Sequence, residues 1–232
     1  MTPRIVILRP EPGASASAKR ACALGLDPIV APLFDLHPLA WDPPDPARFD
    51  AVLLTSANAA RLAGPGLAGF AHLPCHAVGE ASAAATAGAG FLHIETGPGD
   101  AGDALAAVAA AGHARVFHPC GRDHVAVEAP GVTVTRRAVY AAEARDALDP
   151  EAARAIADGV LVLVHSPRAG ALLGALVADR GTARIAAISA AAAEAAGQGW
   201  AEVHVAASPR DEALLELAAR LCDIRAEAER GR

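Results

Sequence analysis

Short runs of consecutive apolar residues alternate with longer alanine-rich stretches along most of the chain. The runs that we predict to be strands are 5–8, 28–30, 51–54, 116–117, 160–164 and 184–188. Stretches such as 15–24, 101–111 and 211–221 have the composition of helices. Strands without polar alternation are typical of parallel sheets that helices cover on both faces. The pattern therefore predicts an α/β fold with parallel sheets flanked by helices.

Local signals place one helix with particular clarity. Asp149 precedes Pro150, which is the usual pairing of a helix N-cap with proline at the first helical position. Gly159 follows where a glycine commonly ends a helix. We therefore expect a short helix between these residues.

The two halves of the chain resemble each other. Residues 53–64 align with 163–174, and residues 77–83 align with 187–193 at the same offset. Each half then reads as strand, serine-bearing turn, helix, strand, small-residue turn, helix, strand and helix. Solenoid repeats have periods of about 20–50 residues, so a repeat of this greater length indicates a duplicated domain.

The first strand–helix–strand piece, residues 5–31, is too small to fold alone and can complete the sheet of the second half. The proline-rich segment 32–50 and the segment 136–146 then read as connectors. We expect two domains joined by two crossing strands, with a cleft between them. The predicted bounds are 1–35 with 144–232 for one domain, 41–136 for the other, and 36–40 and 137–143 for the linkers.

Composition restricts the class of partner and the compartment. The chain is 53% hydrophobic and carries a net charge of −6 with a single lysine, so we do not expect it to bind nucleic acid. No apolar run reaches the length of a membrane span, and the start lacks a signal-peptide pattern. The four cysteines are scattered without paired spacing. These features predict a cytoplasmic protein, and we expect it to be a monomer.

Two motifs suggest chemistry that ordinary turns also explain. Residues 97–102 read Gly-Pro-Gly-Asp-Ala-Gly, which matches the glycine spacing of a dinucleotide fingerprint. A proline and Asp100 stand where a pyrophosphate would settle, so we favour a turn in which Asp100 or Asp103 caps a helix. His118, Cys120 and His124 lie close in sequence, but they lack the spacing of a zinc site, so we favour a strand-end loop.

Hydroxyl residues follow predicted strands in both halves. Thr55-Ser56 follows the strand at 51–54, and His165-Ser166 follows the strand at 160–164. Hydroxyls at such positions cap helices. Amides and hydroxyls at the carboxyl ends of parallel strands also bind anions. Tyr140, the only tyrosine, is either an amphipathic anchor for a crossing strand or a phenol that donates a proton or hydrogen bond in the cleft.

Taken in order, these motifs resemble the uroporphyrinogen-III synthase family over nearly the whole chain. The order and spacing of the motifs carry the resemblance, and no single motif does. They are Leu8-Arg9-Pro10, Pro32-Leu33-Phe34, residues 49–59, residues 77–83, Pro119-Cys120-Gly121, Val139-Tyr140 and Val164-His165-Ser166-Pro167. The family's two α/β domains, joined by two crossing strands, match the organisation predicted above.

The resemblance implies a cofactor-free lyase of tetrapyrrole and heme biosynthesis that acts on the small molecule hydroxymethylbilane. This linear tetrapyrrole loses its hydroxyl as water, ring D attacks through its substituted carbon, and a spiro intermediate rearranges to uroporphyrinogen III. Without enzyme the chain closes to the symmetrical isomer I. The resemblance assigns Tyr140 to assist loss of the hydroxyl. The residues expected to bind the substrate are Arg9, Thr55, Ser56, Ser82, Gly121, Arg122, Ser166, Arg168 and Ser189.

The chain also departs from the family's pattern. Many relatives offer threonines in the two small-residue turns, whereas this chain has Ser82 in the first and only Ser189 in the second. Backbone amides can replace the missing hydroxyls. Two other functions stay open at this point: a non-catalytic two-domain binder of small anions, and a nucleotide-dependent α/β enzyme. A rise in melting temperature with NAD(P) or with a bilane analogue would separate them.

Overall fold

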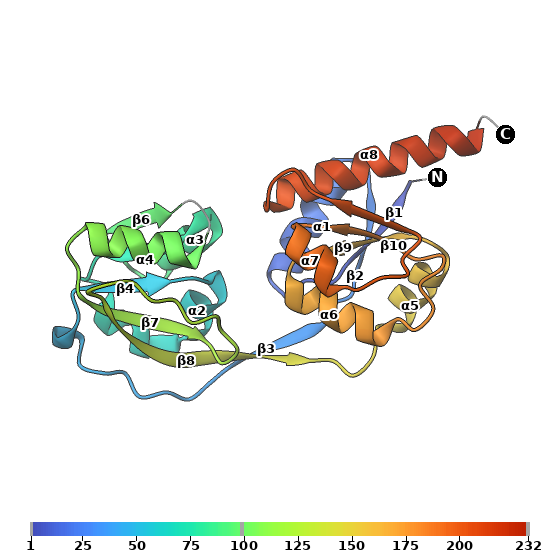
Figure 1. Cartoon of the computed structure of the whole chain (residues 1–232). Coiled ribbons are helices and arrows are strands. Elements are labelled where there is room, and N and C mark those ends of the chain that lie inside the picture. The colour runs from blue at the N-terminus through green and yellow to red at the C-terminus, as the bar shows by residue number, and fades with distance from the viewer. Residues whose placement is uncertain (1, 98–99, 231–232) are drawn as a thin grey trace. The chain divides into compact units, whose positions relative to one another are not determined.

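The computed structural model describes residues 2–97 and 100–230 (Figure 1). The chain divides into two compact units. Unit 1 consists of Met1–Asp35 with Ala144–Arg232, and unit 2 consists of Leu36–Glu143. Unit 1 is therefore built from two segments that are distant in sequence, and unit 2 is continuous.

Unit 1 contains a five-stranded sheet in which the adjacent strands are parallel. Its order is β11-β10-β9-β1-β2. The strands are β1 (Arg4–Ile7), β2 (Asp27–Val30), β9 (Leu161–Val164), β10 (Arg184–Ala187) and β11 (Glu202–Val205). Ile5 of β1 lies opposite Leu161 of β9. The N-terminal piece thus completes the sheet of the second half, as the sequence predicts.

Helices cover both faces of this sheet (Figure 1). They are α1 (Gly13–Ala23), α5 (Pro150–Ala157), α6 (Pro167–Leu176), α7 (Ala190–Ala195) and α8 (Asp211–Arg230). Ile5 and Leu163 of the sheet pack with Ala21 of α1 and Leu214 of α8 in one core. β9 and β10 are buried along their whole length, which explains why their sequences are apolar apart from Arg184 at the start of β10.

Unit 2 contains a six-stranded sheet of order β3-β8-β7-β4-β5-β6. The strands are β3 (Phe34–Pro38), β4 (Ala51–Leu54), β5 (Cys75–Val78), β6 (Ile94–Gly97), β7 (Arg115–Gly121) and β8 (Thr133–Ala144). The pairings from β8 to β6 are parallel. The helices are α2 (Ala57–Leu62), α3 (Gly79–Gly88) and α4 (Ala101–Ala110), with 3-10 helices η1 (Pro46–Arg48) and η2 (Gly64–Phe70).

The few aromatic side chains of unit 2 are concentrated in one core. Phe117 of β7 stacks on Phe70, with ring centroids 4.2 Å apart, and on Trp41 at 5.8 Å. Phe49 lies at 5.4 Å from Phe117. Aromatic residues make up only 3% of the chain, which predicts a core of aliphatic residues. The core around Leu214 in unit 1 fits this prediction, but this core of unit 2 does not. Aromatic residues are grouped here because each large ring needs large neighbours to fill the space around it.

The duplicated organisation is confirmed element by element. β4, α2, β5, α3, β6 and α4 of unit 2 correspond to β9, α6, β10, α7, β11 and α8 of unit 1. β7 lies beside β4 as β1 lies beside β9. The two linkers expected as crossing strands are largely strand in the structure, since 36–38 lie in β3 and 137–143 lie in β8. Leu39 N donates to Val139 O at 2.9 Å, so the two segments support each other.

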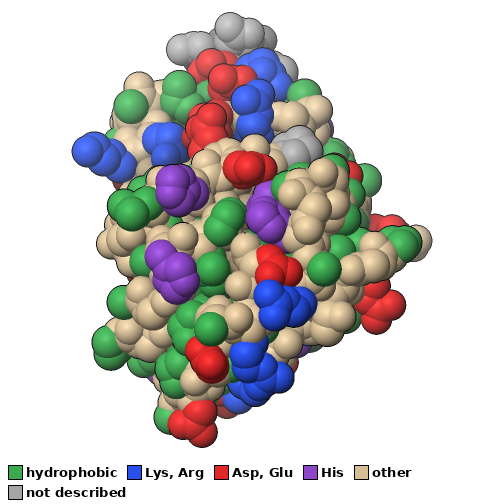
Figure 2. Space-filling view, turned by 90° about the vertical axis from the view of Figure 1, so that its left-hand side faces the viewer, with side chains coloured by type: hydrophobic (Ala, Val, Ile, Leu, Met, Phe, Trp, Pro, Cys, Tyr) green, Lys and Arg blue, Asp and Glu red, His purple; other side chains and the backbone are tan. Residues whose placement is uncertain are grey.

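Acidic and basic side chains are interspersed over the face in Figure 2, with hydrophobic side chains between them. None of the helices in the described ranges is both long and apolar enough to cross a membrane.

Candidate active site

Tyr140 lies on β8 at the carboxyl end of the sheet of unit 2. In the register of β7 and β8 it lies opposite Gly121, next to a bulge between Cys120 and Gly121. A Cβ atom at position 121 would come within 2.9 Å of Tyr140 Cζ and 3.0 Å of its Oη. The half-buried phenol ring therefore lies directly against the backbone of Gly121, and a larger residue would displace it.

Ser56 is the hydrogen-bond partner of the phenol. Tyr140 Oη donates to Ser56 Oγ at 3.2 Å, and Ser56 also accepts from Asn58 N at 3.2 Å as the N-cap of α2. Ser56 follows β4, which neighbours β7, so Ser56, Gly121 and Tyr140 share one edge of the sheet. This is the edge at which parallel α/β sheets usually bind ligands.

Thr55 is held by a buried histidine. Thr55 Oγ1 lies 3.0 Å from His118 Nε2, and His118 is fully buried in β7. Burial, with smaller contributions from His124 and Arg136, lowers the pKa of His118 to about 4, so its imidazole is neutral near pH 7. His124 Nδ1 donates to the carbonyl of Gly121 at 3.0 Å, because a carbonyl can only accept. The two histidines thus hold both sides of the strand end beside Tyr140.

Two other residues of unit 2 that are predicted to bind the substrate, Arg122 and Ser82, make contacts outside the group around Tyr140. Arg122 Nη2 donates to Glu143 Oε1 at 2.9 Å, and both side chains are about half exposed. A substrate carboxylate would therefore have to compete with Glu143. Ser82 lies in the first turn of α3 with 5% of its surface exposed, and its carbonyl accepts from Thr86 Oγ1 at 2.7 Å.

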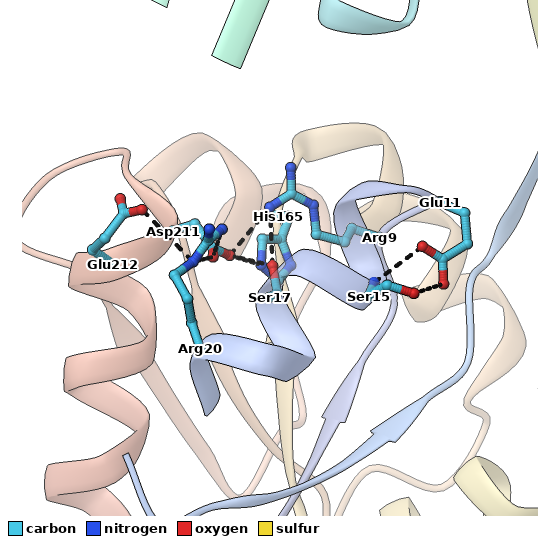
Figure 3. Close-up of polar contacts among 8 residues, drawn as sticks. All are labelled: Arg9, Glu11, Ser15, Ser17, Arg20, His165, Asp211 and Glu212. Carbon is cyan, nitrogen blue, oxygen red and sulfur yellow. Dashed lines mark hydrogen bonds and ion pairs between the residues drawn. The ribbon is translucent and has the colours of Figure 1, made fainter. Parts of the chain in front are cut away.

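The remaining predicted residues lie at the corresponding edge of the sheet of unit 1. Ser166 and Ser189 follow β9 and β10 and cap α6 and α7, accepting from Ala169 N at 3.1 Å and Ala192 N at 3.3 Å. Arg168 Cζ lies 4.5 Å from the centroid of the Phe34 ring. Arg9 follows β1 and donates through Nη1 to Asp211 Oδ1 at 3.2 Å (Figure 3). The capping role expected for these serines is present, and each hydroxyl keeps a proton to donate.

The structure therefore gathers Thr55, Ser56, Gly121 and Tyr140 at one site in unit 2. Arg9, Ser166 and Ser189 follow three neighbouring strands of unit 1. The sequence predicts a strand-end loop at His118, but this residue lies buried within β7, because the strand continues to Gly121. Neither the contact of His118 with Thr55 nor that of Asp211 with Arg9 was predicted. The only signals are a histidine within an apolar strand and an aspartate at a helix start, and both patterns are common in ordinary cores and caps.

The two alternative motifs can be compared with the structure in part. Pro98 and Gly99 of the glycine-rich motif lie outside the described residues, whereas Asp100 caps α4 by accepting from Asp103 N at 2.9 Å. The predicted cap is thus confirmed. Among the described residues, no group of three or more His, Cys, Asp or Glu side chains is arranged to hold a metal ion.

Comparisons with known proteins agree with this architecture. A crystal structure of uroporphyrinogen-III synthetase from Helicobacter pylori 26695 matches with a TM-score of 0.64 and 17% identity, covering 94% of this chain and 99% of that one. A mutant uroporphyrinogen III synthase from the extremely thermophilic bacterium Thermus thermophilus matches with a TM-score of 0.50 and 17% identity, covering 94% and 98%. At this identity both show a shared fold.

A search of curated proteins finds no match. The sequence profile described as Uroporphyrinogen-III synthase HemD, by contrast, matches residues 15–216. This match spans most of the chain and includes both units and the site around Tyr140. The chain therefore belongs to the uroporphyrinogen-III synthase HemD family.

Proposed function

We propose that Tyr140 is the residue of this chain that assists loss of the hydroxyl group from hydroxymethylbilane. As a family member the chain is a cyclising hydro-lyase of heme biosynthesis, which converts this substrate to uroporphyrinogen III. The reaction removes one molecule of water and changes no oxidation state. Its chemical requirements are therefore a proton or hydrogen-bond donor at the departing oxygen and control of the substrate's conformation.

The contact between Tyr140 and Ser56 is the observation that carries this proposal. A phenol donates a single hydrogen bond, and here it donates across 3.2 Å, which is long for an O–H···O contact. The hydroxyl of a bound substrate can take the place of Ser56 as acceptor. The O–H would then be aimed at the oxygen that leaves as water, while the ring stays fixed against Gly121.

The later steps are carbon–carbon bond changes within the substrate. Loss of water leaves an electrophilic azafulvene on ring A, which ring D attacks through its substituted carbon. The spiro intermediate breaks and recloses with ring D inverted. The protein's contribution to these steps is to hold one folded conformer, since the unassisted chain closes at the free carbon and gives isomer I.

The substrate carries an acetate and a propionate on each ring, so conformational control requires anion contacts. We assign these contacts to Arg9, Arg122 and Arg168 and to the hydroxyls of Thr55, Ser56, Ser166 and Ser189. Charge-assisted hydrogen bonds from guanidinium groups are directional, and helix N-termini add favourable dipoles. Because the side chain of Ser82 is buried, its place in this proposal depends on the backbone amides of the first turn of α3.

The test is the Tyr140→Phe variant, which keeps the ring against Gly121 and removes only the O–H. We expect formation of isomer III to fall by about a hundredfold or more, since a positioned acid contributes on the order of 10²–10⁴ in rate. Isomer I should become the main product, and the melting temperature should stay close to that of the wild type. Chromatographic separation of the two isomers measures the outcome.

Two results would contradict different parts of the proposal. A Tyr140→Phe variant that is as fast as the wild type would remove Tyr140 from the reaction while leaving the function intact. A wild-type chain that accelerates no formation of isomer III would contradict the function itself. We also expect a cytoplasmic enzyme that is a monomer and works without a cofactor. Sedimentation of the purified chain would test whether it is a monomer, and an assay after extensive dialysis would test whether it needs a cofactor.

A further inference from the structure

A buried carboxylate connects three segments at the ligand-binding edge of the sheet of unit 1 (Figure 3). Asp211 is the first residue of α8, and only 9% of its surface is exposed. Its Oδ1 accepts from Ser17 Oγ at 2.7 Å and from Arg9 Nη1 at 3.2 Å, and it lies 2.8 Å from His165 Nε2. Its Oδ2 accepts from Arg20 Nε at 2.9 Å and Nη2 at 2.5 Å.

This carboxylate stays ionised because its hydrogen bonds outweigh its burial. Burial alone would raise the pKa of Asp211, but bonds from His165, Ser17 and Arg20 hold the pKa well below its usual 3.8. Burial lowers the pKa of His165, so the histidine is neutral near pH 7. The negative charge of Asp211 is therefore available to the two guanidinium groups.

Arg9 is one of two partly exposed arginines in this cluster, the other being Arg20. The Nη1 of Arg9 is used by Ser17, at 3.1 Å, and by Asp211. Its Nε and Nη2 make no hydrogen bond within the described part of the chain, and 30% of its side chain is exposed. Figure 3 shows one terminal nitrogen of Arg9 pointing away from the other seven labelled residues.

A glycine supports the opposite side of the same group. A Cβ atom on Gly13, the first residue of α1, would lie 2.7 Å from Arg9 Nε, 2.9 Å from Cζ and 3.0 Å from Nη2. These three atoms belong to one plane, so the guanidinium rests against the Gly13 backbone. The orientation of Arg9 is thus set from two sides, by the Asp211 carboxylate at one edge of the guanidinium and by the Gly13 backbone at the start of α1 against its face.

We infer that Asp211 is a positioning residue, which with Gly13 holds Arg9 so that its outer nitrogens face a carboxylate of the substrate. This inference rests on the proposed function, in which Arg9 binds hydroxymethylbilane. An arginine that is already ordered loses less side-chain entropy on binding. This arrangement also leaves the outer nitrogens of the Arg9 guanidinium available for a bidentate contact with a carboxylate. Asp211 acts through Arg9 and touches no substrate itself.

Gly13→Ala is the most selective test, because it leaves every charge in place. Gly13 does not have a positive φ, and alanine favours helices, so we expect the melting temperature to be equal to or above that of the wild type. The new methyl group should push Arg9 from its orientation and raise KM for hydroxymethylbilane about fivefold, with kcat little changed. Gly88→Ala in α3 is the matched control, since its Cβ would meet open space, and its KM should equal that of the wild type.

Double variants show whether the effect passes through Arg9. Arg9→Ala should raise KM about tenfold, the typical effect of one charge-assisted contact. Adding Gly13→Ala or Asp211→Ala to Arg9→Ala should raise KM no further, although Asp211→Ala should lower the melting temperature. Arg20→Gln, which loses its contact with Asp211 but does not touch Arg9, should lower the melting temperature and leave KM unchanged.

The possible outcomes are distinct. If Gly13→Ala has the KM of the wild type while Arg9→Ala does not, positioning by this cluster is wrong. A rise in KM from Gly13→Ala that persists in the Arg9→Ala background would also overturn it. Arg9→Ala with an unchanged KM would show that Arg9 binds no substrate, which ends the inference but not the proposed function. Only a wild-type protein that makes no isomer III would overturn both the inference and the proposed function.

Discussion

Two glycines determine where the two most informative polar side chains lie. Gly121 allows the Tyr140 ring to approach the backbone of β7, and Gly13 does the same for the Arg9 guanidinium at the start of α1. In both places the missing Cβ atom creates the space that the functional group occupies. Neither glycine requires a positive φ, so close approach rather than backbone freedom explains the residue type.

Gly121→Ala should therefore reduce catalysis without unfolding the protein. The added methyl group would lie 2.9 Å from Tyr140 Cζ, so the ring must swing away and its O–H loses its aim. We expect kcat to fall about tenfold or more, because misplacing a catalytic group by about 1 Å can cost about a hundredfold. Steady-state kinetics and a melting curve measure the two effects. In the Tyr140→Phe background the same substitution should cost little more, and a full additional loss would argue against displacement of the phenol.

His118 should make folding stability depend on pH. Burial lowers its pKa from 6.5 in the unfolded chain to about 4 in the folded protein. As the pH falls from 6.5 to 4, the unfolded chain takes up a proton that the folded protein does not, so the free energy of unfolding decreases. In His118→Gln this slope should be smaller by up to about 1.4 kcal/mol per pH unit.

Urea unfolding at several pH values between 4 and 7 measures that slope. The absolute stability of His118→Gln will also change, but the comparison uses only the dependence on pH. His76 and His165 also have pKa values lowered by burial and contribute equally to both proteins. Equal slopes for the two proteins would contradict a neutral, buried His118.

At the scale of elements, helix starts have two uses in this fold. Ser56, Ser166 and Ser189 each accept a backbone N–H at the first turn of a helix that follows a parallel strand. The same hydroxyls and amides point to the edge at which we propose the substrate carboxylates bind. α5 differs from these helices, because its cap Asp149 accepts from Glu151 N and Ala152 N and is not among the proposed site residues.

Asp149→Ala should thus lower stability and leave activity unchanged. Loss of a helix N-cap costs about 1 kcal/mol, which corresponds to a melting temperature lower by about 3 °C in a protein of this size. Asp149→Asn is the control. Because asparagine caps helices equally well, this variant should have the melting temperature of the wild type. Calorimetry gives both values. Equal destabilisation by the two substitutions would mean that charge rather than capping matters at this position.

At the scale of the whole molecule, the duplicated units differ in how their sheets are completed. The sheet of unit 2 takes β7 and β8 from the same stretch of chain, whereas the sheet of unit 1 takes β1 and β2 from the opposite end. β9 therefore depends on β1, with Val6 and Val162 side by side and fully buried. We therefore expect unit 1 to form only when both of its segments are present.

A chain that lacks residues 1–35 should lose unit 1 as a folded body. Removing β1, α1 and β2 exposes the buried β9 and one side of the core that contains Leu214. We expect a clearly lower urea m-value, because m increases with the surface that unfolding exposes. Adding the separate peptide 1–35 should restore part of the difference. An m-value equal to that of the intact chain would show that the second half folds without its N-terminal strands.

The sequence alone was sufficient for the elements and their order. Continuous apolar runs such as 51–54 and 160–164 are typical of buried strands, and Asp149-Pro150 marks a helix start, because these signals are local. The small size of the first strand–helix–strand piece, residues 5–31, likewise predicted that it completes the sheet of the second half. The residues at the strand ends, including Thr55, Ser56 and Arg9, could be proposed because parallel strands end at one edge, whereas the role of Tyr140 was implied by the family resemblance.

Only the tertiary structure decided what each of these residues touches. Tyr140 follows Ser56 by 84 positions and Asp211 follows Ser17 by 194, and no local pattern links residues so far apart. The positions of His118 behind Thr55 and of Asp211 behind Arg9 depend on strand register and on how helices pack over the sheet. Secondary structure is determined largely by residues that are neighbours in sequence, whereas the site depends on side chains that meet only after the sheets have formed.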